Sequence, residues 1–413
     1  MALKINKSKL AVAPSAQLHS HGWRPVFTEN SSVWPLVSTE HMEGRAINFG
    51  AGPSALPEDV LIEATKGLLN FEGTGIGIAE ISHRSKEFDA CQSKLESLIR
   101  TLLNVPQTHS ILFTQGGGCA QFSAVVLNML ARHRLLHPEL KEEERVMDYV
   151  VTGSWSQKAA AEARRLGGGR VNIVADGRNS STKDKKSFDN IPPHGENDNV
   201  YKFSPDPALI YYCENETIDG VQFAHDSSSP ASFPFHRLPQ NALLPLVGDH
   251  SSSFMSRSIP HLADHAVIYA GAQKNIGPAG LTILIVRQDC IIDVDAAAKL
   301  GASPVPLTMS YKTIADHKSL YNTPSTLSIY ISGLVLKRNQ EQGGLEHTQK
   351  VNREKQAKVY EAIEESGGVL RRKVKQGSGS WMNIVFDVEG DGAESRFVAG
   401  ADKLGMKSLK GHR

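Results

Sequence analysis

Two residues with useful side-chain chemistry stand directly after strongly apolar segments of the sequence. Lys274 follows "VIYAGAQ" and precedes "LTILIV", and Asp249 follows "LLPLVG". Such apolar runs are typical of buried strands, where a charged side chain needs a partner. Lys274 is therefore either a solvated loop residue or an amine held at the end of a sheet for chemistry. Asp249 is either a structural hydrogen-bond acceptor or the partner of a cationic group.

A Gly-rich turn follows a third apolar segment, "HSILFT". In "QGGGCAQF", the residues Gly117, Gly118 and Cys119 precede an expected helix. Backbone N–H groups at the N-terminus of a helix can bind a phosphate group. The spacing is not a complete G-x-G-x-x-G, because Gln121 stands at the last position. A phosphate site and an ordinary Gly-rich turn both stay open.

Trp155 and Thr217 also follow apolar segments. Trp155 comes after "YVVTGS", and Thr217 lies in "NETIDG" after "ALIYYCE". Trp155 could stack on a planar ring or pack in the core or an interface. Thr217 could donate a hydrogen bond to a ring oxygen or simply belong to a turn, since Asn, Asp and Gly favour turns.

Together, these residues fit the requirements of pyridoxal phosphate. Lys274 supplies an amine for a Schiff base, and Asp249 keeps a pyridine nitrogen protonated so that the ring can accept the electrons of a carbanion. Trp155 offers a stacking surface, and Gly118 and Cys119 offer phosphate donors. Ligands bind at the carboxyl ends of parallel strands. We therefore predict that these residues share one cofactor site.

The segments that must position these residues alternate between strand and helix patterns. Expected strands cover residues 109–115, 146–153, 208–214, 243–249, 266–272, 281–286 and 381–388. One expected helix begins near Pro57. Five others cover residues 87–105, 120–133, 154–167, 345–366 and 393–406. This alternation predicts an α/β fold whose large domain has a mostly parallel sheet sandwiched by helices. A smaller α+β domain is expected at the C-terminus.

The expected domain organisation has three parts. Residues 1–45 form an irregular extension, residues 46–345 the large cofactor-binding domain, and residues 346–413 an incomplete small domain. Residues 46–60 are expected to pack as an arm with the small domain. Residues 177–200 are polar and are expected to form a surface loop.

The composition excludes several classes of partner. The 413 residues carry a net charge of +1, so we expect no binding to nucleic acid or to an anionic membrane. No apolar run reaches the roughly 20 residues that span a bilayer. The four cysteines, Cys91, Cys119, Cys213 and Cys290, show neither a metal-binding nor a disulfide spacing, so no metal is expected. The basic first 28 residues resemble a mitochondrial presequence faintly, and a cytoplasmic location is the main expectation.

The sequence resembles the phosphoserine aminotransferases, which belong to the fold type I pyridoxal phosphate enzymes and to the class V aminotransferases. The resemblance runs from about residue 46 to the end of the chain. It rests on "INFGAGPSALP", "EISHRSKEF", "QGGGCAQFSAV", "ENETIDGV", "DHSSS", "YAGAQKNIGPAGLTI", "YNTPST" and "LKGHR". It implies a homodimer with shared active sites. That dimer would transfer the amino group of L-glutamate to 3-phosphooxypyruvate, giving O-phospho-L-serine and 2-oxoglutarate in serine biosynthesis by ping-pong chemistry.

The resemblance implies a role for each matching residue. Lys274 would form the Schiff base and carry the proton, and Asp249 would pair with the ring nitrogen. Trp155 would stack on the ring, and Thr217 would bond its 3-hydroxyl side. The cofactor phosphate would be held by Gly118, Cys119 and Gln273, with Asn322 and Thr323 of the partner subunit. The substrate phosphate or the glutamate carboxylate would be received by His83, Arg84, His412 and Arg413.

Two departures from the family pattern keep alternatives open. Cys119 stands where bacterial members often carry Arg, and the family continues beyond Arg413 through a further arginine that grips the α-carboxylate. An inactive, truncated homologue that acts as a binding or scaffold protein is therefore the alternative function. An alanine–glyoxylate aminotransferase or a cysteine desulfurase is a rival within the cofactor class. A nucleotide-dependent dehydrogenase is disfavoured, because "YVVTG" does not end in an acidic residue.

Overall fold

The computed structural model describes residues 44–181, 183–195, 200–240 and 243–410. These residues belong to one compact unit that spans residues 41–413. Most of the predicted N-terminal extension, as well as His412 and Arg413, lies outside the described residues.

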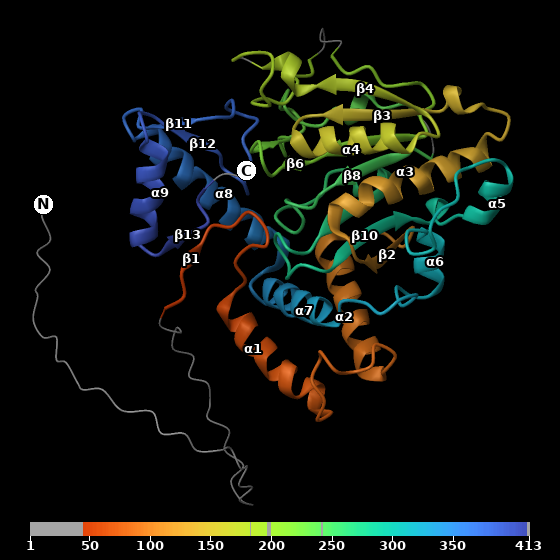
Figure 1. Ribbon diagram of the computed structural model, residues 1–413, viewed down its shortest axis with the longest axis horizontal. Helices are drawn as coiled ribbons and strands as arrows, with labels where there is room; N and C mark the ends of the chain where they lie inside the picture. Colours follow the sequence, from red (N-terminus) through yellow and green to blue (C-terminus); the bar gives the residue numbers. More distant parts are fainter. Residues whose placement is uncertain (1–43, 182, 196–199, 241–242, 411–413) are drawn as a thin grey trace, which may run out of the picture. The chain divides into compact units, whose positions relative to one another are not determined.

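A seven-stranded sheet with the order β2-β10-β9-β8-β5-β3-β4 carries the site (Figure 1). Its strands are β2 (His109–Thr114), β3 (Val146–Val151), β4 (Arg170–Asp176), β5 (Leu209–Cys213), β8 (Leu246–Asp249), β9 (His265–Gly271) and β10 (Thr282–Arg287). Neighbouring strands are parallel except for β10, which runs antiparallel to both β2 and β9. The short connection between β9 and β10 permits this reversal. The predicted α/β fold with a mostly parallel sheet is confirmed.

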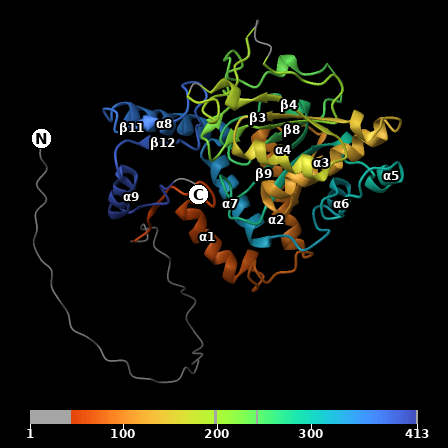
Figure 2. The same cartoon turned by 45° about the horizontal axis from the view of Figure 1, so that its top comes forward.

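Helices cover both faces of this sheet. The helices around it are α1 (Glu58–Leu69), α2 (Lys86–Leu103), α3 (Gly117–Leu136), α4 (Ser154–Leu166), α5 (Val294–Lys299), α6 (Tyr311–Asp316) and α7 (Thr326–Glu341). Two further helices, α8 (Gly344–Glu364) and α9 (Ala393–Lys403), pack against short strands of the C-terminal segment instead. Side chains alternate between the two faces of a strand. In β9, Ile268 packs in the same core cluster as residues of α1, α2 and α7, whereas Tyr269 packs with residues of α3 and α4. Helices α3 and α4 lie side by side over the strands in both views (Figures 1 and 2).

Part of the sheet is covered by irregular chain rather than by a helix. Ile191, Tyr201 and Phe223 pack in one core cluster with Ile210 and Tyr212 of β5. The expected surface loop over residues 177–200 is therefore only partly exposed. The structure buries Asp189, Asn190 and Ile191 within it.

The C-terminal segments form two small sheets. β11 (Leu370–Arg372) pairs antiparallel with β12 (Phe386–Val388). β13 (Met406–Lys407) pairs in parallel with β1 (Ile47–Asn48), so the chain near residue 47 lies beside a strand close to the C-terminus. The position predicted for a domain boundary, residue 345, lies in the first turn of α8, which begins at Gly344. Within the described residues, no helix is long and apolar enough to cross a membrane.

Candidate active site

Lys274 lies three residues beyond the end of β9, at the carboxyl ends of the parallel strands. Its Nζ donates a hydrogen bond to Thr217 Oγ1 at 3.4 Å. Burial lowers the pKa of Lys274, and the nearby Asp249 opposes this shift. A lower pKa enriches the neutral amine, which is the nucleophilic form.

The turn at residues 51–54 fixes the position of Lys274. The Ser54 backbone N–H donates to the Gln273 carbonyl at 3.0 Å, and the Ser54 hydroxyl donates to the Lys274 carbonyl. A Cβ atom at Gly52 would lie 2.4 Å from Lys274 Cδ. Gly52 also has a φ of +142°, which L-residues rarely adopt. Only glycine therefore allows this turn to pack against the lysine.

Asp249 is the last residue of β8 and is 5% exposed. Its Oδ1 accepts from the Ser251 N–H at 2.9 Å, and its Oδ2 accepts from the Tyr269 hydroxyl at 2.9 Å. The Tyr211 hydroxyl lies 3.4 Å from the same Oδ2. Burial raises the pKa of Asp249, since the charged form loses water. A cationic partner would compensate for this loss.

The Gly-rich turn leads into the N-terminus of α3 beside Asp249. Gly117 N–H donates to Thr282 Oγ1 at 2.8 Å. The N–H groups of Gly118 and Cys119 have no acceptor within the described part of the chain, as expected in the first turn of a helix. A Cβ atom at Gly118 would lie 3.8 Å from Asp249 Oδ2. The two free donors at this helix N-terminus can form an anion site. The same turn lies close to the buried Asp249 carboxylate.

Trp155 and Thr217 are joined through Glu216. Glu216 belongs to the hairpin of β6 (Asn215–Glu216) and β7 (Val221–Gln222). Its Oε2 accepts from the Trp155 N–H at 2.8 Å, and its Oε1 accepts from the Ser156 N–H at 2.9 Å. The hairpin thus caps the N-terminus of α4 and connects the residue that precedes Thr217 to Trp155.

Glycine at position 153 allows this cap. A Cβ atom at Gly153 would lie 2.3 Å from Glu216 Cγ. Glu216 is fully buried, and burial raises its pKa to about 7. Asp219 completes the cap by accepting from the Ser154 N–H at 2.7 Å. The "NETIDG" turn is therefore built to hold α4 and Thr217 in one fixed arrangement.

The other predicted site residues are held less firmly. Gln273 is half-buried next to Lys274. Asn322 and Thr323 are exposed. The Asn322 side chain donates to Gln115 Oε1 at 2.8 Å, which places both residues beside the Gly-rich turn of the same chain. His83 is half-buried and Arg84 is exposed, and within the described residues neither side chain has a hydrogen bond or ion pair.

Three residues in the site were not singled out from the sequence. Gly52 and Glu216 lie inside the quoted motifs "INFGAGPSALP" and "ENETIDGV", and those motifs were the available signal. Tyr269 is two residues before the end of β9 and pairs with Asp249 in the sheet register. The register of β8 against β9 could not be predicted, so Tyr269 could not be assigned to Asp249.

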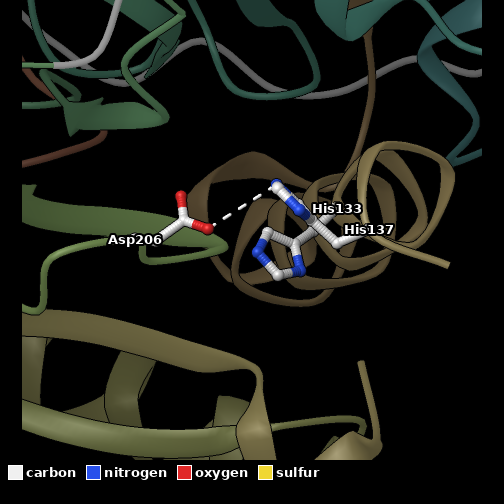
Figure 3. A group of neighbouring side chains, drawn as sticks. All are labelled: His133, His137 and Asp206. Carbon is white, nitrogen blue, oxygen red and sulfur yellow. Dashed lines mark ion pairs between the residues drawn. The ribbon is translucent and has the colours of Figure 1, made fainter. Parts of the chain in front are cut away.

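A second group of potential ligands lies at the C-terminal end of α3 (Figure 3). His133, His137 and Asp206 place one ligand atom each within 4.8 Å of one another. Arg145 Nη1 contacts His133 Nδ1 at 2.8 Å. An arginine can only donate, so the Nδ1 of a neutral His133 is the acceptor and its Nε2 carries the proton.

The same contacts weigh against a cation at this group. Burial and the Arg145 charge lower the pKa of His133 to about 4, so its ring is neutral and has no free lone pair. His137 Nε2 lies 3.6 Å from Asp206 Oδ2, which is ordinary pairing near a helix C-terminus. We therefore treat the group as a structural contact.

The residues around Lys274 fit pyridoxal phosphate on three observations. The free N–H groups of Gly118 and Cys119 suit its phosphate, and the buried Asp249 carboxylate suits its ring nitrogen. The Trp155 Nε1 atom is buried without a hydrogen-bond partner among the described residues, and Lys158 Nζ lies 4.3 Å from the centroid of the indole ring, which therefore offers an aromatic face to a planar cation or ring. This set of donors and acceptors fits a pyridine ring that carries a phosphate.

Comparison with known proteins agrees with this geometry. The chain belongs to the aminotransferase class-V family, which it matches over residues 46–412. It is a pyridoxal-phosphate-dependent aminotransferase.

The similar proteins include phosphoserine aminotransferases. The chain is 40% identical to the phosphoserine aminotransferase of Ectopseudomonas mendocina over 90% of this chain and 91% of that protein. A solved phosphoserine aminotransferase from Bacillus circulans subsp. alkalophilus is 34% identical with a TM-score of 0.74, covering 89% of this chain and 90% of that chain. A structure of pyridoxal-phosphate-bound phosphoserine aminotransferase from Trichomonas vaginalis is 33% identical with the same TM-score of 0.74, covering 89% of this chain and 92% of that chain.

Proposed function

We propose that this protein transfers the amino group of L-glutamate to 3-phosphooxypyruvate, giving O-phospho-L-serine and 2-oxoglutarate in serine biosynthesis. The observation that carries the proposal is the meeting of Lys274 with Thr217 at the strand ends, next to the buried Asp249. The substrate pair follows from the similarity to phosphoserine aminotransferases. No observation favours the alternative of an inactive scaffold protein.

Each cofactor contact has a physical reason. When bound, pyridoxal phosphate supplies a ring that stabilises negative charge on the substrate α-carbon. The Gly118 and Cys119 N–H groups would hold its phosphate together with the Gln273 side chain. Asp249 would keep the ring nitrogen protonated, since its own burial calls for a cationic partner.

Trp155 and Thr217 would orient the ring. Trp155 would lie against one ring face, and the Thr217 hydroxyl would bond the 3-hydroxyl side. Because Glu216 bonds the Trp155 backbone and directly precedes Thr217, the two contacts would move together. This coupling fixes the ring relative to Lys274.

Lys274 would move the proton. Its pKa is lowered by burial, so Nζ can be neutral and can accept a proton from the substrate α-carbon. The same Nζ would then deliver that proton to the C4′ atom of the cofactor. The contact with Thr217 and the packing of Gly52 limit the positions that Nζ can reach.

The substrate anion would be bound by basic residues in the outer turns. His83 and Arg84 have no protein acceptor among the described residues, so their donors are available for a phosphate or a carboxylate. A guanidinium fork suits the geometry of either group. His412 and Arg413, which lie outside the described residues, are proposed for the same anion.

We propose that the protein works as a homodimer with shared active sites in the cytoplasm. Asn322 and Thr323 of the partner subunit would reach the cofactor phosphate. The exposure of both residues supports this, because a residue that contacts a second subunit must be accessible in the single chain. The two-domain division near residue 345 belongs to the same proposal.

An absorption spectrum of the purified protein tests the cofactor and the first half-reaction. Adding glutamate should convert the lysine-bound cofactor to its amine form, and adding 3-phosphooxypyruvate should reverse this change. Pyruvate and glyoxylate should reverse it far less. A colourless protein that takes up no pyridoxal phosphate would contradict the proposal, and equal turnover of all three acceptors would contradict its substrate.

A further inference from the structure

A cavity of about 550 Å³ lies between the chain that follows β7 and helix α8. Its walls come from residues 222–229, from α8, and from the segment 372–381. None of the residues assigned to the cofactor or to its substrates lines it. Small-molecule sites commonly have volumes of roughly 300–1,000 Å³, so the cavity is large enough for a small organic ligand.

The cavity is held open by backbone contacts across its floor. Gln222 N–H donates to the Ser378 carbonyl at 2.9 Å, and Ser380 N–H donates to the Gly220 carbonyl at 2.9 Å. The Trp381 N–H donates to Gln222 Oε1 at 2.7 Å. These bonds join the β6–β7 hairpin to the segment after β11, so the pocket exists before any ligand arrives.

Two guanidinium groups face this cavity. Arg353 lies 5.4 Å from the ring centroid of Trp381, and within the described residues it has no carboxylate partner. Arg372 lies over the Tyr360 ring at 3.9 Å, and the carboxylate nearest to it belongs to the exposed Glu364 at 3.9 Å. Weakly paired arginines at a cavity wall are donors that an oxyanion can use.

The opposing charge in the lining is small. Among the described residues that line the cavity, Asp226 is the one acidic residue. Its carboxylate already accepts hydrogen bonds from the Ser228 N–H at 2.9 Å and from the Ser228 hydroxyl at 2.7 Å. Burial lowers the pKa of His225, so His225 adds no positive charge near neutral pH. The lining therefore carries two positive charges, from Arg353 and Arg372, and one negative charge, from Asp226, which is already hydrogen-bonded. Its net charge is positive.

Neutral donors extend the same surface. Gln349 and Gln356 are spaced by four and three residues from Arg353, so their neutral amides line the cavity from the same face of α8. Trp381 supplies an apolar wall, and the His225 ring stacks on it at 6.1 Å with an interplanar angle of 13°. The lining thus combines charged forks, amides and an aromatic surface, which is the composition of a site for an organic anion.

We propose that this cavity is a second ligand site, which binds a small organic anion through a carboxylate or phosphate group held by Arg353 and Arg372. The site lies apart from the cofactor residues. Its floor is nevertheless the β6–β7 hairpin, which contains Glu216 and whose turn contains Thr217. A ligand here therefore contacts the same hairpin that orients the cofactor ring.

Calorimetric titration of the full, cofactor-loaded protein tests this proposal. Inorganic phosphate and citrate serve as the phosphate and carboxylate probes, and the difference between them identifies the preferred anion. We expect saturable binding of at least one probe. Arg353→Gln should weaken it about tenfold, because one charge-assisted hydrogen bond is lost. Adding Arg372→Gln should abolish it.

Control variants show whether the loss of binding is specific to these two arginines. Arg371→Gln removes the neighbouring charge, but Arg371 is 64% exposed, pairs with Glu389 at 2.8 Å and does not line the cavity, so binding should be unchanged. Arg353 is exposed, so its variant should fold normally, which a thermal unfolding curve can check.

Two results would overturn the proposal. The first is the absence of saturable binding by either probe. The second is binding that survives Arg353→Gln but disappears in Arg84→Gln, because the anion would then occupy the proposed substrate site. Transamination by Arg353→Gln at low anion concentration is measured in parallel, so that failure of the cavity proposal and failure of the proposed function are told apart.

Discussion

The residues at the strand ends and those in the outer turns differ in how the chain holds them. Asp249 is 5% exposed and bonds Ser251 and Tyr269, and Lys274 contacts Thr217. Arg84 and Asn322, in contrast, are exposed, and Arg84 has no side-chain partner among the described residues. The sheet therefore holds the strand-end side chains in fixed contacts within one chain, whereas no protein contact among the described residues holds the side chain of Arg84.

This difference also separates two electrostatic environments. Burial raises the pKa of Asp249 and lowers that of Lys274, so both groups are shifted toward their neutral forms. Arg84, in contrast, is exposed to water. Substitutions at the strand ends should therefore affect the chemical step, and substitutions in the outer turns should affect substrate binding.

The largest expected effect comes from Lys274→Ala. It removes the amine that we propose carries the proton, and turnover should fall by on the order of 10⁴-fold. The spectrum should also lose the absorption of lysine-bound cofactor. Lys299→Ala, which alters an exposed lysine in the last turn of α5, is the control and should be fully active. Normal turnover by Lys274→Ala would end the distinction between the two regions.

The next effect is expected from Asp249→Asn. The amide preserves the shape of the side chain but removes the negative charge opposite the ring nitrogen, so turnover should fall by on the order of 10²-fold. Cofactor affinity should fall as well, as measured by dialysis and reconstitution. Asp264→Asn alters an exposed carboxylate just before β9 and should leave both quantities unchanged. Equal behaviour of the two variants would show that the buried charge has no special role.

A smaller effect is expected in the outer turns. Arg84→Gln removes the guanidinium group that we propose binds the substrate anion. KM for 3-phosphooxypyruvate should therefore rise about tenfold while kcat changes little. Steady-state kinetics with varied acceptor measures both constants. Lys86→Gln, on an exposed neighbour in α2, should behave as the wild type. A fall in kcat with an unchanged KM would place Arg84 with the strand-end residues instead.

The strand-end residues were predictable because the strands themselves have unmistakable patterns. The predicted strand over residues 266–272 corresponds to β9, and that over residues 281–286 corresponds to β10. Ligand sites in parallel sheets lie at the carboxyl ends, so knowing where a strand ends identifies its candidate residue. This rule made Asp249 and Lys274 candidates, and their combination with the Gly-rich turn, Trp155 and Thr217 predicted the cofactor site.

Contacts that depend on the order and register of strands could not be predicted. Tyr269 reaches Asp249 only because β8 and β9 are neighbours with those residues opposite each other. The predicted strand over residues 381–388 forms only at Phe386–Val388, because the Trp381 N–H bonds the Gln222 side chain instead of a neighbouring strand. Both outcomes depend on residues far apart in the sequence, which local patterns do not relate.

The smallest effect on turnover, and the sharpest test of the buried region, is expected from Glu216→Gln. The Trp155 N–H, the Ser156 N–H and the Ser156 hydroxyl all donate to this carboxylate. An amide offers one acceptor fewer, so at least one bond is lost and unfolding should become easier by about 1–3 kcal/mol. Cofactor affinity should fall only several-fold, since the ring contacts shift without being removed.

The pH dependence of this variant gives the decisive measurement. Burial raises the pKa of Glu216 to about 7, so between its ordinary value and about pH 7 the native state holds a proton that the unfolded chain has lost. The free energy of unfolding of the wild type should therefore fall as pH rises through this window. The amide of Glu216→Gln cannot titrate, so the stability advantage of the wild type over the variant should narrow over the same range in denaturant unfolding curves. Glu346→Gln, which alters an acid in the first turn of α8, is the control, and its free energy of unfolding should change with pH as that of the wild type does. If the free energy of unfolding of Glu216→Gln also changed with pH as in the wild type, Glu216 would be ionised over the whole range.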